Sequence, residues 1–75
     1  MEKLIKQLQQ IKSDVDFTHE THLVEDRLLK SFDVIQIIAM LDEEYDISVP
    51  AAQILPKNFN SAQAIYDLIQ RLSDD

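Results

Sequence analysis

Apolar residues recur three and four positions apart in three separate stretches of the chain, which is the spacing of one face of a helix. The first stretch predicts a helix over about residues 2–12. The strongest predicts a central helix over 31–45, and the last predicts a helix that begins near Asn60 and runs to the C-terminus. No stretch alternates with period two for long enough to predict a strand, so the fold is expected to be all-α.

The segment between the first two helices, residues 13–30, has no helical period. It opens on turn-prone residues, Ser13-Asp14-Val15-Asp16, and predicts a long loop. Loops of this length in small domains are usually functional or disordered. Apolar residues such as Phe17 and Leu23 indicate that this one is pinned to the core.

Two prolines and an asparagine mark the segment between the central and last helices. A short third helix is expected to start at Pro50 and to be closed by Pro56. Asn60 and Gln63 have the spacing of a capping box, which predicts the start of the fourth helix.

Composition limits the kinds of site that the chain could hold. Its 75 residues fit one domain, 1–75, without a second core, and we expect a monomer. Cysteine is absent, which excludes disulfides, zinc-thiolate sites and a cysteine nucleophile. Glycine is absent as well, which excludes the glycine-rich loops that cradle phosphates.

The charge balance narrows the range of partners. Fourteen acidic and seven basic residues give a net charge of −7. This charge repels nucleic acid and anionic lipid, so the expected partners are basic protein surfaces. No apolar run has the length of a signal peptide or a membrane span, so we expect a cytoplasmic protein without membrane insertion.

Ser31 is the candidate site because it opens the central helix directly after the long loop. A hydroxyl there lies near free backbone N–H groups and the positive end of the helix dipole, which suits a phosphate group. The simpler interpretation is that Ser31 only caps the helix, and spacing alone favours it.

One side of the central helix continues from Ser31 as an apolar strip with an acidic edge. Positions four, eight and eleven along a helix return to nearly the same azimuth. The residues of this strip and its edge are Ile35, Gln36, Ala39, Asp42 and Glu43. Acids near a helix C-terminus oppose the dipole by about 0.3–1 kcal/mol. This cost favours a docking surface over a merely solvated helix end.

His19 and His22 in the long loop raise the alternative of a metal site. The segment has no helical period and no fourth strong ligand, so we interpret both as surface histidines and expect no metal. No combination of nucleophile, base and orienting residue can be assembled from the sequence, so we expect no enzyme activity.

The chain resembles the acyl carrier proteins at residues 28–35, Leu-Leu-Lys-Ser-Phe-Asp-Val-Ile, and 41–47, Leu-Asp-Glu-Glu-Tyr-Asp-Ile. This resemblance covers almost the whole chain. It implies an acidic four-helix bundle with a long loop between helices one and two and a short third helix. It also implies a 4′-phosphopantetheine arm on Ser31, attached from coenzyme A by a phosphopantetheinyl transferase. That arm would hold an acyl or aminoacyl thioester and present it to partner enzymes, as in fatty acid biosynthesis.

The cargo stays open at this point. Residues 55–62, Leu-Pro-Lys-Asn-Phe-Asn-Ser-Ala, are similar to the D-alanyl carrier proteins, whereas other members of the family carry fatty acyl chains. Room for an acyl chain is expected to depend on side chains along the seam of the third and fourth helices, which are Ile54, Phe59, Ile65 and Leu68.

Lys30 departs from the family pattern, which has an acid directly before the serine, and Phe32 replaces the usual Leu. Asp33 matches the acid that follows, and with the strip it is expected to contact the basic surfaces of loading and transfer enzymes. An ammonium group can neither cap a helix nor hold Mg²⁺. Lys30 therefore leaves a second function open, that of a degenerate carrier fold acting as an unmodified protein-interaction module.

Overall fold

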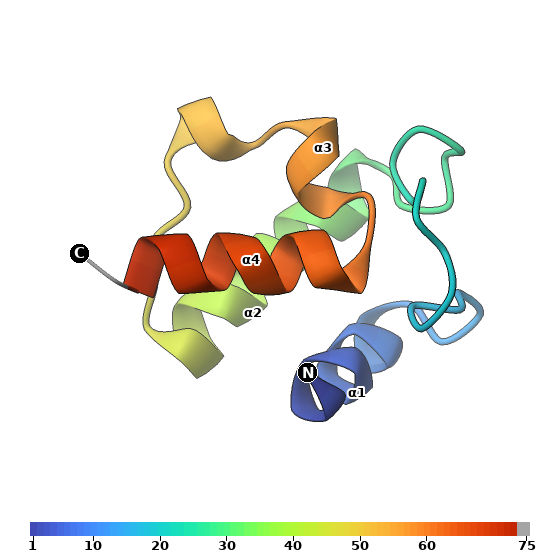
Figure 1. Ribbon diagram of the computed structural model, residues 1–75, viewed down its shortest axis with the longest axis horizontal. Coiled ribbons are helices and arrows are strands. Elements are labelled where there is room, and N and C mark those ends of the chain that lie inside the picture. The colour runs from blue at the N-terminus through green and yellow to red at the C-terminus, as the bar shows by residue number, and fades with distance from the viewer. Residues whose placement is uncertain (74–75) are drawn as a thin grey trace.

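The computed structural model describes residues 1–73, which form four α-helices, one short 3₁₀ helix and no strand (Figure 1). The elements in chain order are α1 (Glu2–Ile11), α2 (Ser31–Tyr45), η1 (Ala51–Gln53), α3 (Pro56–Phe59) and α4 (Ala62–Ser73). The all-α prediction is confirmed, as are the bounds of the central helix. Within these residues, no helix is long and apolar enough to cross a membrane.

The core is built from one face of each long helix together with the loop that joins α1 to α2. Helix α1 packs against both α2 and α4, and α3 packs against α4. Leu8, Ile37 and Ile65 are fully buried at the centre, one from each long helix. Phe17 and Leu23 are also buried, which confirms that the loop is pinned to the core. This loop lies at one end of the molecule, opposite the C-terminal end of α4 (Figure 1).

The predicted position of the third helix is wrong. Pro50 precedes only the 3₁₀ helix η1, and α3 begins at Pro56, the residue that was expected to close the helix. The physical reason is that the first residue of a helix has no intrahelical use for its N–H, so proline fits there. Asn58, buried in α3, donates a hydrogen bond to the Gln53 carbonyl at 2.7 Å and so fastens η1 to α3.

The predicted capping box of the fourth helix is also wrong. Ser61 caps α4 instead, because its hydroxyl accepts a hydrogen bond from the Ala64 N–H at 3.0 Å. The Asn60 side-chain oxygen accepts hydrogen bonds from the N–H groups of Val24 and Glu25 at 3.0 and 3.2 Å. Asn60 therefore fastens the long loop to the junction of α3 and α4.

Asp46 ends α2 in the left-handed conformation, with φ of 55°, where a Cβ atom is unfavourable. Asp46→Gly is expected to raise the free energy of unfolding by about 0.5–1 kcal/mol, because glycine adopts this conformation freely and the substitution removes an acid from the negative end of the helix. Urea denaturation checks this, with Asp46→Ala as the control that keeps the Cβ atom. Equal stability of the glycine and alanine variants would show that the left-handed backbone costs nothing.

Candidate functional site

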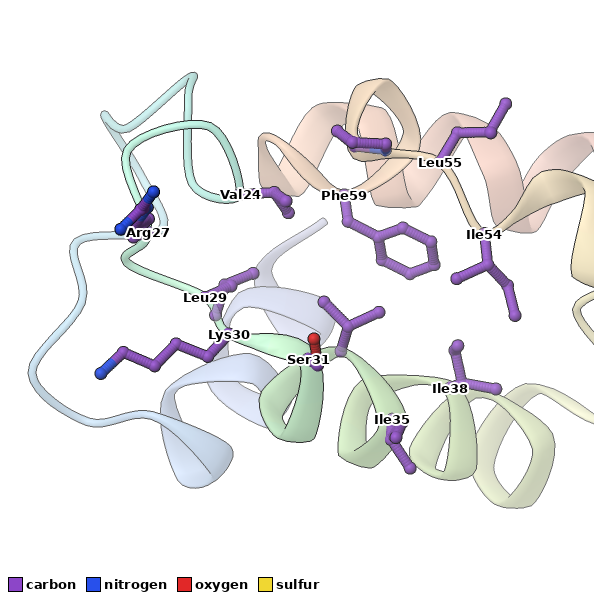
Figure 2. A pocket seen from close by; sticks show the side chains of 12 residues that line it. Val24, Arg27, Leu29, Lys30, Ser31, Ile35, Ile38, Ile54, Leu55 and Phe59 are labelled. Atoms are coloured by element: carbon purple, nitrogen blue, oxygen red, sulfur yellow. The ribbon is translucent and has the colours of Figure 1, made fainter.

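Ser31 is the first residue of α2 and is exposed. The expectation that it caps the helix is wrong, because the N-cap position is taken by Lys30. The Lys30 side chain has no acceptor atom, so it satisfies none of the free N–H groups at the start of the helix. The Ser31 hydroxyl faces the mouth of a cavity instead (Figure 2).

This cavity has a volume of about 700 Å³, within the usual range for small-molecule sites. Its walls come from the end of the long loop, from α2, and from the segment that runs through η1 and α3. Nine of the lining residues are apolar: Val24, Leu29, Val34, Ile35, Ile38, Ile54, Leu55, Pro56 and Phe59. The polar ones are Arg27 and Lys30, which lie at one side of the view, and Ser31, which lies between them and Ile35 (Figure 2). The cavity can therefore hold an apolar group close to the serine.

The predicted seam between the third and fourth helices supplies only part of this cavity. Ile54 and Phe59 line it, as expected. Ile65 and Leu68 do not, because both side chains are fully buried in the core. The opposite wall, formed by Val34 and other residues of α2, was not identified from the sequence.

Large apolar side chains are exposed in the cavity lining and on α2 next to Ser31. Phe32 and Ile35 on α2 are 68% and 62% exposed, and Ile54 and Leu55 are 43% and 39% exposed. Single exposed apolar residues are ordinary, but three that line one cavity, Ile35, Ile54 and Leu55, together with Phe32 next to Ser31 in the sequence, indicate a contact surface.

The residues expected to contact partners, which are the docking strip and Asp33, lie on the surface with one exception. Those that are exposed are Ile35, Gln36, Ala39, Asp42 and Glu43. Asp33 is the exception, because its side chain is only 11% exposed. Asp33 was expected to contact partners, and the structure corrects this: its carboxylate accepts a hydrogen bond from the Lys30 backbone N–H at 3.0 Å and forms an ion pair with Lys12 at 3.5 Å. Its role is to hold the start of α2.

Lys30→Asp is expected to raise the free energy of unfolding by about 1 kcal/mol. An aspartate at the N-cap accepts a hydrogen bond from the first turn of α2 and interacts favourably with the positive end of the dipole. Urea denaturation measures the gain, and Lys30→Ala serves as the control that removes the ammonium without adding an acceptor. If the alanine and aspartate variants were equally stable, the missing cap would not limit stability.

Two titratable groups away from Ser31 have shifted pKa values. In the long loop, His19 Nδ1 lies 2.8 Å from Asp16 Oδ2, and this hydrogen bond lowers the pKa of Asp16. Because the folded pKa is depressed, this pair stabilises the loop above the unfolded pKa of about 4 and loses its effect as the pH falls through the folded value. Burial raises the pKa of Tyr45, whose hydroxyl donates a hydrogen bond to Gln7 across the α1 and α2 interface at 2.7 Å. Both groups serve the fold.

The histidines of the long loop do not assemble a metal site. Among residues 1–73, no group of three or more His, Cys, Asp or Glu side chains is placed to hold a metal ion. His19 is engaged with Asp16, and His22 contacts the Thr21 hydroxyl at 3.1 Å.

Comparison with known proteins decides the family. No model of a known protein family matches the chain. A curated acyl carrier protein from Buchnera aphidicola subsp. Baizongia pistaciae (strain Bp) is 33% identical over 54 residues, which cover 72% of this chain and 67% of the relative. The chain belongs to the acyl carrier protein family. It is therefore a carrier and not an enzyme, as the absence of a catalytic combination in the sequence led us to expect.

Membership in the acyl carrier protein family gives the site its context. The family as a whole uses a phosphopantetheine group, and its members work with enzymes. The exposed Ser31 hydroxyl and the apolar cavity beside it are compatible with such a group. Sequence reasoning found Ser31 but missed Arg27, whose position on the cavity rim depends on how the long loop folds back toward α2.

Proposed function

We propose that this protein carries an apolar acyl group as a thioester on a 4′-phosphopantetheine arm attached to Ser31. The observation that carries the proposal is the position of Ser31, exposed at the start of α2 with its hydroxyl at the mouth of an apolar cavity of about 700 Å³ (Figure 2). Residues 1–75 act as one carrier domain in this proposal.

Attachment requires only that Ser31 offer its hydroxyl to a transferase. The hydroxyl oxygen would form a phosphodiester with the phosphopantetheine portion of coenzyme A, and adenosine 3′,5′-bisphosphate would leave. When attached, the arm supplies the thiol that forms the thioester. The chain contributes a fixed helix start, because Asp33 is held by the Lys30 N–H and by Lys12. Base, metal and orientation would come from the transferase, since the charged side chains that line the cavity beside Ser31 are cations, Arg27 and Lys30.

The cavity favours an acyl chain over D-alanine or another amino acid as the cargo. Its walls are apolar, and burying an alkyl chain there is favourable by about 0.8 kcal/mol for each methylene group. An aminoacyl group carries an ammonium ion, which needs an acidic partner in such a site. The charged residues that line this cavity are Arg27 and Lys30, which repel an ammonium ion.

Partner enzymes would dock on the exposed side of α2. Ile35 and Ala39 offer apolar contact, and Gln36, Asp42 and Glu43 form the polar edge of the same strip. Charges in such positions set the rate of encounter more than the final affinity.

Modification of Ser31 is tested by incubating the protein with coenzyme A and a broad-specificity phosphopantetheinyl transferase and then mapping the peptides by mass spectrometry. We expect one phosphopantetheine, on the peptide that contains Ser31, and none in a Ser31→Ala variant. A modified peptide from Ser13, Ser48, Ser61 or Ser73 would contradict the assignment. No modification by any transferase would instead favour the unmodified interaction module, the alternative function suggested by Lys30 in place of the family's acid.

The cargo is tested with arms loaded with octanoyl or D-alanyl groups. We expect the octanoyl form to melt at a higher temperature than the unacylated form, and the D-alanyl form to show no gain. Ile54→Asp, which places a carboxylate in the cavity wall, is expected to remove the octanoyl gain. A larger gain with D-alanine than with octanoate would contradict the acyl assignment.

A further inference from the structure

Two cations lie beside Ser31 on a protein that is acidic as a whole. Arg27 and Lys30 are the only Lys or Arg residues between Lys12 and Lys57 in the sequence. Both are exposed, and both line the cavity at whose mouth Ser31 lies. Their side chains extend outward on the same side of Ser31, away from Ile38 and Ile54 (Figure 2).

Neither the Arg27 nor the Lys30 side chain forms an ion pair or a hydrogen bond within the part of the chain that the structure describes. Arg27 and Lys30 form no ion pair there, whereas Lys12 is paired with Asp33 and Arg71 donates a hydrogen bond to Asn58 at 3.1 Å. Asp26 precedes Arg27 and is exposed, but it does not line the cavity. The two charges at the rim are therefore available to another molecule.

The opposite charge lies at the other end of the same helix. Asp42 and Glu43 are exposed in the last turns of α2. A rise of about 1.5 Å per residue separates them from Lys30 by roughly 18 Å along the helix axis. This separation exceeds the screening length of about 8 Å at physiological salt, so a partner senses each charged end separately. Exposed apolar residues, Phe32 and Ile35, lie between the two ends.

We infer that this surface is bipolar and fits an enzyme that places acidic residues against Arg27 and Lys30 and basic residues against Asp42 and Glu43, with an apolar patch between them. The inference rests on the proposed carrier function and adds the charge pattern of the partner. A uniformly basic partner face meets repulsion next to Ser31, where the transfer must occur. The two charged ends also fix the direction in which α2 lies on the partner, because the reversed orientation brings like charges together at both ends.

The test uses a broad-specificity phosphopantetheinyl transferase as the probe, in two versions. In one version, the transferase residue that faces the position before the carrier serine is set to Lys, and in the other it is set to Glu. Binding is measured at low salt with Ser31→Ala carrier, so that no transfer occurs. We expect the protein with Lys30 to bind the Glu version about tenfold more tightly than the basic version, and Lys30→Asp to reverse this preference. Both preferences should shrink to less than about twofold at high salt.

The matched control is Lys6→Asp, which makes the same change in net charge on the exposed side of α1, away from the cavity lining. It is expected to keep the preference of the parent. An identical preference in the parent and the Lys30→Asp variant, or a reversal by Lys6→Asp as well, would overturn the bipolar surface. Transfer to Ser31 is followed in parallel with the serine intact. Transfer without a charge preference would refute this inference alone, whereas a charge preference without transfer to Ser31 by either version would refute the proposed carrier function.

Discussion

Asn60→Ala is expected to lower the free energy of unfolding by about 2–3 kcal/mol, a large effect for a residue outside the apolar core. Its side-chain oxygen accepts hydrogen bonds from the N–H groups of Val24 and Glu25, and its side-chain NH₂ group donates a hydrogen bond to the Glu25 carboxylate at 3.0 Å. Removing the side chain leaves the partly buried Val24 N–H without its partner and breaks two exposed hydrogen bonds to Glu25, and each lost hydrogen bond costs about 1 kcal/mol. Urea denaturation measures the loss, and amide hydrogen exchange at Val24 and Glu25 locates it.

Gln63→Ala is the matched control, because Gln63 is the other half of the capping box that the sequence suggested. Its amide donates a hydrogen bond to Asp67 on the exposed side of α4, so its loss should cost less than about 0.5 kcal/mol. Equal costs for Asn60→Ala and Gln63→Ala would mean that the long loop is not held by Asn60.

Asp42→Lys with Glu43→Lys is expected to slow the transfer of phosphopantetheine to Ser31 by about tenfold at low salt, without loss of helicity. Both side chains are exposed, so their replacement removes long-range attraction to a basic region of the transferase and leaves packing unchanged. Transfer rates at several salt concentrations measure the effect, and circular dichroism checks the fold.

The control for this charge reversal is Asp14→Lys with Asp67→Lys, which changes the net charge equally at exposed sites on the loop and on α4. We expect it to reduce the rate much less. If the two double variants were transferred equally slowly, only net charge would matter. If the Asp42 and Glu43 variant kept the parent rate at low salt, the acidic edge would be only a solvated helix end.

The long helices could be predicted from the sequence because their apolar stripes are long and regular. The bounds of α2 agree with the prediction, and those of α1 differ by one residue at the C-terminal end. The short α3 could not be placed, because four residues make no stripe and Pro56 is compatible with either end of a helix. Asn60 was misassigned for a related reason: its partners, Val24 and Glu25, are more than thirty residues away in the sequence.

In the site, too, a residue with a local sequence pattern could be predicted, whereas features that depend on the folded chain could not. Ser31 was found because a serine after a long loop and before a periodic helix is a local pattern. The cavity was predicted only in part, at Ile54 and Phe59, because its other walls come from the loop and α2, which only the folded chain brings to this segment. Asp33 was expected on the surface, and its burial depends on Lys12 at the end of α1. Arg27 gave no signal of its own in the sequence.

The central claim, that Ser31 carries the arm, is tested most directly by the intact mass of the protein purified from the cells in which it naturally occurs. We predict a species heavier than the unmodified chain by one phosphopantetheine, or by one acylated phosphopantetheine, with the addition on the Ser31 peptide. A Ser31→Ala protein from the same cells should have only the mass of the chain. A parent protein found entirely at the mass of the unmodified chain, or modified at a different residue, would contradict the claim.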